Sequence, residues 1–143
     1  MNDLDKVCAI AKEAGDILLG YAGQLDESQV TSKSSSRDLV TAADLAAENH
    51  IISRLQDEFP GTSFWAEESH AEDDSAAVQW CIDPLNGTVN FVQQLTMYAV
   101  SIARLVNKKT DLAVVYIPVL DQCFSASESQ VSQLNGANIA VST

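Results

Sequence analysis

The sequence predicts an α+β fold in which two helices pack on one large, mostly antiparallel sheet. Helical periodicity is confined to about the first 60 residues, whereas β-branched and aromatic runs separated by short turns fill the remainder. Helices that are segregated in sequence from hairpin-connected strands are typical of this class. The 143 residues are enough for one domain with its own core, so we expect residues 1–143 to form a single domain.

The first helix is expected over residues 3 to about 22. Apolar residues recur there at spacings of three and four. They are Leu4, Val7, Cys8, Ala11, Ala14, Leu18 and Tyr21. Gly20 and Gly23 indicate its end, and the polar, serine-rich stretch over residues 24–37 is expected to be a loop.

A second helix is predicted to begin at Thr41. Thr41 and Asp44 have the form of a capping box, with Asp in place of the usual Glu. An inward stripe follows, made of Ala47, Ile51, Ile52, Leu55 and Phe59. Pro60 and Gly61 end the helix.

The remaining chain alternates strand and turn patterns. Strands are expected over residues 63–67, 79–83, 98–106, 112–117 and 122–126. A charged loop is expected over 70–77, and a turn over 107–110. Asp121 is placed in a tight turn, and the pair Asn135-Gly136 predicts a final hairpin.

The composition limits the function classes. The formal net charge of −12 argues against a nucleic-acid-binding face, because such a face is basic. The simplest interpretation is a soluble protein whose copies are kept apart by repulsion between like charges. No apolar leader and no apolar run of about 18 residues is present, so neither a signal peptide nor a membrane helix is expected. Three dispersed cysteines are typical of reduced thiols, which favours a cytoplasmic protein.

Residues 80–91 carry the strongest chemical signal. An apolar strand runs into Asp83-Pro84, where the missing N–H of proline is expected to end it. Asn86, Gly87 and Thr88 then predict a tight turn that opens a short helix. A carboxylate at a strand end supplies the hard oxygen that Mg²⁺ prefers, and N–H groups at a helix start suit a phosphate.

This segment resembles the signature of the inositol monophosphatase family, Asp-Pro-(Leu/Ile)-Asp-Gly-Thr-x-Asn-Phe after an apolar strand. Residues 33–44 resemble the family's Lys-x(4)-Asp-Leu-Val-Thr-x-x-Asp, and residues 63–69 resemble its strand ending in Glu-Glu-Ser. Residues 114–121 resemble the strand and turn that follow, so the resemblance covers essentially the whole chain. It implies the same α+β fold, as the N-terminal half of the family's sugar-phosphatase architecture.

The resemblance also implies site roles, with Mg²⁺ as cofactor and sensitivity to lithium. Glu67, Asp83 and the backbone carbonyl of Leu85 correspond to metal ligands, and Asn86 occupies a further ligand position. Gly87 and Thr88 correspond to phosphate-binding N–H groups. Asp44 and the Thr88 hydroxyl correspond to the catalytic groups that orient the attacking water.

Each of these residues has a simpler interpretation when it is taken alone. Glu67 would lie in a solvated turn, Asp44 would be a helix-start carboxylate, and Asp83 would be a turn residue. Thr88 would be only a helix cap. Their order and spacing within one family pattern favour the site.

Asn86 departs from the pattern, because the family has aspartate there. An amide oxygen can bind a hard cation but brings no negative charge. Two unit charges about 4 Å apart attract by about 4 kcal/mol at an effective dielectric of 20. Asn-Gly and Asp-Gly form tight turns equally well. We therefore expect the change to leave the fold intact and to weaken the binding of a second metal ion at this ligand position.

Length is the other departure. Members of the family continue into a C-terminal α/β half, which this sequence is expected to lack. A sheet surface left without that half would be apolar and exposed, so a homodimer or a complementing C-terminal half is the expected macromolecular partner.

Three functions stay open. The first is magnesium-dependent hydrolysis of a small phosphomonoester such as inositol monophosphate, impaired by Asn86 and by truncation. The second is a catalytically inactive pseudoenzyme that keeps the fold for binding. The third is a 3'(2'),5'-bisphosphate nucleotidase-like activity, which shares the same motifs.

Overall fold

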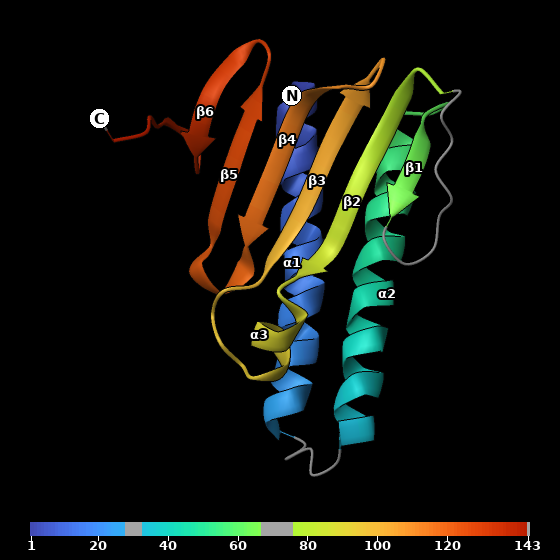
Figure 1. The fold of residues 1–143 in the computed structure, drawn as a ribbon, viewed down its shortest axis with the longest axis vertical. Helices are drawn as coiled ribbons and strands as arrows, with labels where there is room; N and C mark the ends of the chain where they lie inside the picture. The colour runs from blue at the N-terminus through green and yellow to red at the C-terminus, as the bar shows by residue number, and fades with distance from the viewer. Residues whose placement is uncertain (28–32, 67–75, 143) are drawn as a thin grey trace.

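The computed structural model describes residues 1–27, 33–66 and 76–142. Its two long helices, α1 (Asp3–Glu27) and α2 (Lys33–Glu58), lie side by side on one face of a seven-stranded sheet (Figure 1). The strands follow the order of the chain across the sheet. Among the strands of the described residues, the β1–β2 pair is parallel and the other neighbouring pairs are antiparallel. The predicted α+β class is therefore confirmed.

The strands are β1 (Ser63–Ala66), β2 (Val78–Asn86), β3 (Ala99–Val106), β4 (Lys109–Ile117), β5 (Gln122–Ser127), β6 (Gln130–Leu134) and β7 (Ala137–Asn138). A short helix, α3 (Thr88–Val92), follows β2, and one 3₁₀ turn (Pro118–Leu120) joins β4 to β5. The five predicted strands are all present, and the Asn-Gly hairpin adds β6 and β7 to the edge of the sheet.

Both long helices extend further than the sequence patterns predicted. Helix α1 continues past Gly20 and Gly23 to Glu27, because Leu25 is buried and anchors its last turn. Helix α2 begins at Lys33, so Thr41 lies inside the helix and does not cap it. The loop expected over residues 24–37 is thus wrong on both sides of residues 28–32, which lie outside the described part of the chain.

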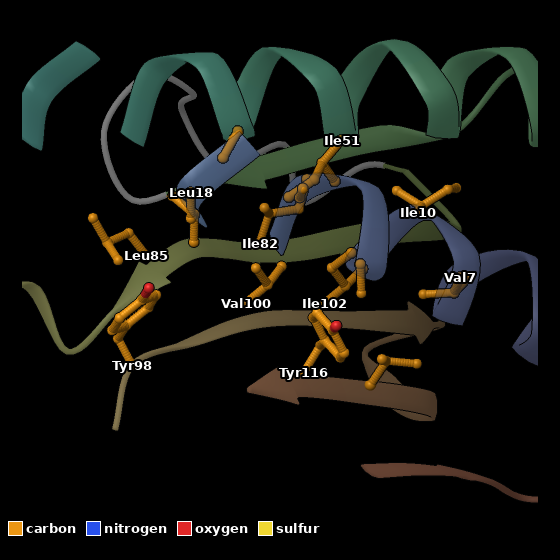
Figure 2. Close-up of a cluster of buried hydrophobic side chains, with 14 of the residues drawn as sticks. Val7, Ile10, Leu18, Ile51, Ile82, Leu85, Tyr98, Val100, Ile102 and Tyr116 are labelled. Carbon is orange, nitrogen blue, oxygen red and sulfur yellow. The ribbon is translucent and has the colours of Figure 1, made fainter. Parts of the chain in front are cut away.

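The core lies between the helices and the inner face of the sheet. Figure 2 shows side chains from both layers meeting there, and the fully buried ones include Val7, Ile10, Leu18, Ile51, Val100 and Ile102. The predicted inward stripe of α2 is confirmed, because Ala47, Ile51 and Leu55 are completely buried. Ile52 and Phe59 pack against the same cluster.

Tight turns set the register of the hairpins. Asn107 and Lys108 have φ of 49° and 68°, and Asn135 and Gly136 have φ of 51° and 83°. Two consecutive residues with positive φ are characteristic of the type I′ turn, whose twist matches that of the flanking strands. Asp121 also has positive φ, at 49°, and this confirms its place in a tight turn.

Ion pairs join the two helices at their outer surface. The Glu13 carboxylate accepts hydrogen bonds from Arg54 at 2.9 Å and from His50 at 2.7 Å. These interactions hold the pKa of Glu13 below its ordinary value, mainly because of the Arg54 hydrogen bond.

In the described ranges, no helix combines the length and the apolar character that a membrane span requires.

Candidate active site

The end of strand β2 positions the candidate residues. The strand was expected to stop at Asp83-Pro84, but it continues to Asn86. Asp83 pairs with Ser101 and Asn86 with Ala99, so β2 has one extra residue between these two pairs. This is a β-bulge, and a bulge tolerates proline because it does not need the missing N–H. The expected strand end was therefore wrong, for a reason that only strand pairing reveals.

Gly87 makes the turn from β2 into α3. Its backbone is left-handed, with φ of 99° and ψ of 43°. A Cβ atom on Gly87 would lie 2.9 Å from the Met97 carbonyl oxygen and 3.2 Å from the Tyr98 Cα. Glycine is required here on both grounds, because a side chain would be strained and would also clash with backbone. The predicted tight turn is confirmed.

Helix α3 is anchored by a buried aromatic pair. The Phe91 N–H donates to the Gly87 carbonyl at 3.0 Å, and the Phe91 ring is completely buried. It meets the Tyr98 ring edge-on, with centroids 5.0 Å apart and planes at 84°. Asn90 Nδ2 donates to the Met97 carbonyl at 2.6 Å. The start of α3 is therefore held rigidly against the segment that leads into β3.

Thr88 is the first helical residue, not the cap. The N-cap is Gly87, and the cap has no side-chain hydrogen bond. The Thr88 hydroxyl is directed back to the Leu85 carbonyl at 3.5 Å, the outer limit of a hydrogen bond. Thr88 is also exposed to solvent. The interpretation of Thr88 as a simple helix cap is thus wrong, and its hydroxyl remains accessible for other contacts.

Two shallow depressions flank this segment on the face of the sheet opposite the long helices. One, of about 350 Å³, is lined by Trp65, Cys81, Ile82, Asp83, Ser101 and Ala103. The other, of about 330 Å³, is lined by Asn86, Gly87, Asn90, Met97, Tyr98, Ala99, Val115 and Ile117. Asp83 and Asn86 therefore open onto neighbouring hollows of one surface.

The structure brings five of the seven candidates together within residues 83–88. Asp44 lies on α2, which packs against both β2 and α3, and its side chain is partly buried. Glu67 lies outside the described residues. The parallel register nevertheless pairs Ala66 with Ile82, the residues that immediately precede Glu67 and Asp83.

Glu48 is a buried carboxylate that was not among the residues the sequence patterns indicated. Its side chain is only 1% exposed on the inner face of α2, one helical turn after Asp44. A buried carboxylate is uncommon and needs compensating contacts. The i, i+4 spacing from Asp44, and a position adjacent to the buried Ala47, were the signals that could have identified it.

The oxygens near the β2 end are of the type that magnesium prefers. They are the Asp83 carboxylate, the Leu85 carbonyl and the Asn86 side-chain oxygen, all hard donors. Within residues 1–27, 33–66 and 76–142, no group of three or more His, Cys, Asp or Glu side chains gathers to hold an ion. The donor types fit Mg²⁺, and Asp83 is the carboxylate that residues 83–88 contribute.

Comparison with known proteins identifies the fold. The model of the inositol monophosphatase family matches residues 2–143. The chain belongs to the inositol monophosphatase family. This confirms the resemblance carried by the signature segment and by the three accompanying blocks.

The relatives extend well beyond the matched region. Nus factor SuhB of Escherichia coli is 39% identical over 93% of this chain and 50% of its own length. Human inositol monophosphatase 1 is 36% identical over 97% of this chain and 51% of its own. The solved structure of inositol monophosphatase from Anabaena superposes with a TM-score of 0.82 at 32% identity, covering 97% of this chain and 49% of that one. The chain thus spans about half the length of the relatives it matches.

Proposed function

We propose that this chain takes part in the magnesium-dependent hydrolysis of a small phosphate monoester of the inositol monophosphate type. The observation that carries the proposal is the turn at Gly87, which only glycine can make and which joins the Asp83 strand end directly to the start of α3. A carboxylate and a set of helix-start N–H groups are thereby fixed within a few residues of each other, as a cation and a phosphate would require.

Each residue has a role in this proposal. Asp83, the Leu85 carbonyl and Glu67 would hold magnesium, with Asn86 at a further ligand position. When bound, the ion would lower the pKa of a water and neutralise phosphate charge. The Gly87 and Thr88 N–H groups would donate to phosphate oxygens. Asp44 and the Thr88 hydroxyl would orient the attacking water and accept its proton.

Asn86 supports a second candidate, in which the fold binds a phosphorylated ligand but turns it over very slowly or not at all. Asn86 is exposed and its turn is well formed, so the fold does not select against aspartate. The missing charge therefore affects the metal and not the structure. The Escherichia coli relative is named as a Nus factor and not as a phosphatase, and this name also supports a binding function as the second candidate.

The substitution Asn86→Asp separates the two candidates. We expect it to lower the magnesium concentration needed for half-maximal phosphate release from inositol 1-phosphate by at least about 100-fold, because it restores a charge beside the ion. Phosphate release is measured against magnesium concentration for both proteins, with and without lithium. Asp83→Asn in the Asn86→Asp background is the matched control, and it should remove the gain.

Identical magnesium dependence in the two proteins would contradict the proposed role of Asn86. Magnesium-dependent release by the Asn86→Asp protein alone would show an impaired phosphatase. Phosphate binding without turnover in either protein, measured by calorimetry, would favour the binding function.

We also propose that the chain is one domain, equivalent to the N-terminal half of its relatives, and that it works in a reducing, cytoplasmic environment. Trp65 and Val115 are partly exposed on the sheet face that carries the two depressions. A second copy or a complementing half would cover this surface. Light scattering on the isolated chain should give a mass above that of one copy, and a monomer at all concentrations would contradict self-association.

A further inference from the structure

Two cysteines that are far apart in the sequence face each other across the α1–β5 interface. Cys8 lies on α1 and is partly exposed, whereas Cys123 on β5 is only 4% exposed. The two side chains share a hydrogen bond, and the Ser125 side chain, two residues along β5, also hydrogen-bonds Cys8. Both β5 residues are buried on the inner face of the sheet, against which α1 packs. Cys8 is thus held against a second thiol and a hydroxyl.

The backbone around Cys123 is rigid. Its N–H donates to Asn135 Oδ1 at 2.9 Å, and its carbonyl accepts from the Asn135 N–H at 2.9 Å. The Asn135 Nδ2 also donates to the Asp121 carbonyl at 3.1 Å. On the other side, Cys8 belongs to a 25-residue helix. The contact between the two thiols is therefore fixed by two well-anchored elements and does not depend on a loop.

The surroundings make the two thiols chemically unequal. The hydrogen bond from the Cys123 thiol, followed by that from Ser125, lowers the pKa of Cys8 below the ordinary thiol value. Lys12 acts in the same direction, and burial together with Asp5 acts against it. The shared hydrogen bond, burial and the charge of Asp121 raise the pKa of Cys123. A lowered pKa at Cys8 beside a raised pKa at Cys123 favours Cys8 as the attacking and Cys123 as the resolving cysteine.

We propose that Cys8 and Cys123 form a reversible disulfide when the protein meets hydrogen peroxide. The Cys8 thiolate attacks one peroxide oxygen, the O–O bond breaks, and the released hydroxide takes up a proton to give water and a Cys8 sulfenic acid. The Cys123 sulfur then attacks the Cys8 sulfur. The S–O bond breaks, a second water leaves with the Cys123 proton, and two thiols have been oxidised by one peroxide.

The disulfide would act on the fold and not on residues 83–88. It would tie the start of α1 to β5, closing a loop that contains most of the chain, and long loops gain most from such a bond. The ordinary alternative is that both cysteines only fill space in the core. That alternative explains the burial of Cys123, but it gives no reason for a partly exposed Cys8 with an activating contact.

The test treats the purified, reduced chain of residues 1–143 with about one equivalent of hydrogen peroxide at neutral pH. We expect a mass loss of about 2 Da in the monomer and a peptide that links Cys8 to Cys123. Cys81 should remain open to alkylation. The melting temperature should rise by roughly 10 °C and return after dithiothreitol. Cys81→Ala is the matched control and should behave like the parent, whereas Cys8→Ala should abolish the mass loss.

Three results would overturn the proposal. They are oxidation of Cys8 to sulfinic acid without a cross-link, oxidation at Cys81 before Cys8, and a disulfide formed only between chains. The unmodified protein supplies all three readouts, so the test does not depend on the folding of any variant.

A separate measurement follows the alkylation rate of Cys8 against pH. Its midpoint should lie below that of an ordinary thiol and should rise in Cys123→Ala.

Discussion

The two faces of the central sheet differ in what they hold. On the face covered by α1 and α2, Val100 and Ile102 of β3 are completely buried. On the opposite face the same strand carries Ala99, Ser101 and Ala103, which are small and only partly buried. Asp83 and Asn86 open onto this second face. One face therefore supplies the core of the domain, and the other carries the two depressions onto which Asp83 and Asn86 open.

The two faces should therefore respond differently to substitution. Buried apolar area is the main source of folding free energy, so the covered face should determine stability. The segment at residues 83–88 should determine function, because its exposed polar groups add little to the core. A segment that is separable from the core can therefore be substituted without loss of the fold.

Removing a side chain that is buried against the covered face is the largest perturbation. Ile51→Ala should lower the free energy of unfolding by about 2–5 kcal/mol, because Ile51 is completely buried between α2 and the sheet and a cavity would remain. Its matched control on the open face is Val115→Ala. Val115 is 38% exposed, so that loss should stay below about 1 kcal/mol. Urea denaturation of both variants gives the comparison.

Equal losses of unfolding free energy in the two variants would contradict the distinction between the faces. A loss for Val115→Ala that grows with protein concentration would instead show that association buries the open face. The measurement should therefore be repeated over at least a tenfold range of protein concentration.

Much of this fold could be predicted from local patterns, and the failures have a common cause. The inward stripe of α2, the five strands and the Asn135-Gly136 hairpin depend on neighbours in sequence, and all were predicted. The ends of the helices depend on tertiary packing. Leu25 is buried beyond two exposed glycines, and Val40 is buried just before the apparent capping box at Thr41. In each case burial against a distant element outweighed a local signal for a helix end.

The candidate site divides in the same way. The turn at Gly87 could be predicted because Asn86, Gly87 and Thr88 are consecutive and glycine has a clear conformational meaning. The bulge at Pro84 could not, since it depends on the register between β2 and β3. The contact between Cys8 and Cys123 was equally hidden, because no local pattern connects residues more than a hundred positions apart. Sequence patterns indicated which residues matter, and packing determined which of them meet.

A smaller effect tests how closely α1 approaches the sheet. A Cβ atom on Gly15 would lie 2.5 Å from Tyr116 Cε2 and 3.1 Å from Pro118 Cγ. The Tyr116 ring is buried, and its hydroxyl donates to Asp121 Oδ1 at 2.9 Å, so it cannot move aside without losing that bond. Gly15→Ala should therefore destabilise the protein by about 1–3 kcal/mol, although alanine is the better helix former.

Gly20 on the same helix is the control, because nothing lies within 4 Å of its added Cβ. Gly20→Ala should stabilise the protein by roughly 0.5–1 kcal/mol, since only helix propensity changes. Opposite signs for one substitution at two positions five residues apart would locate the close contact at Tyr116. Stabilisation by both variants, measured by thermal and urea unfolding, would mean that α1 lies further from β4 than the structure shows. The covered face would then be less tightly packed than the comparison of the two faces requires.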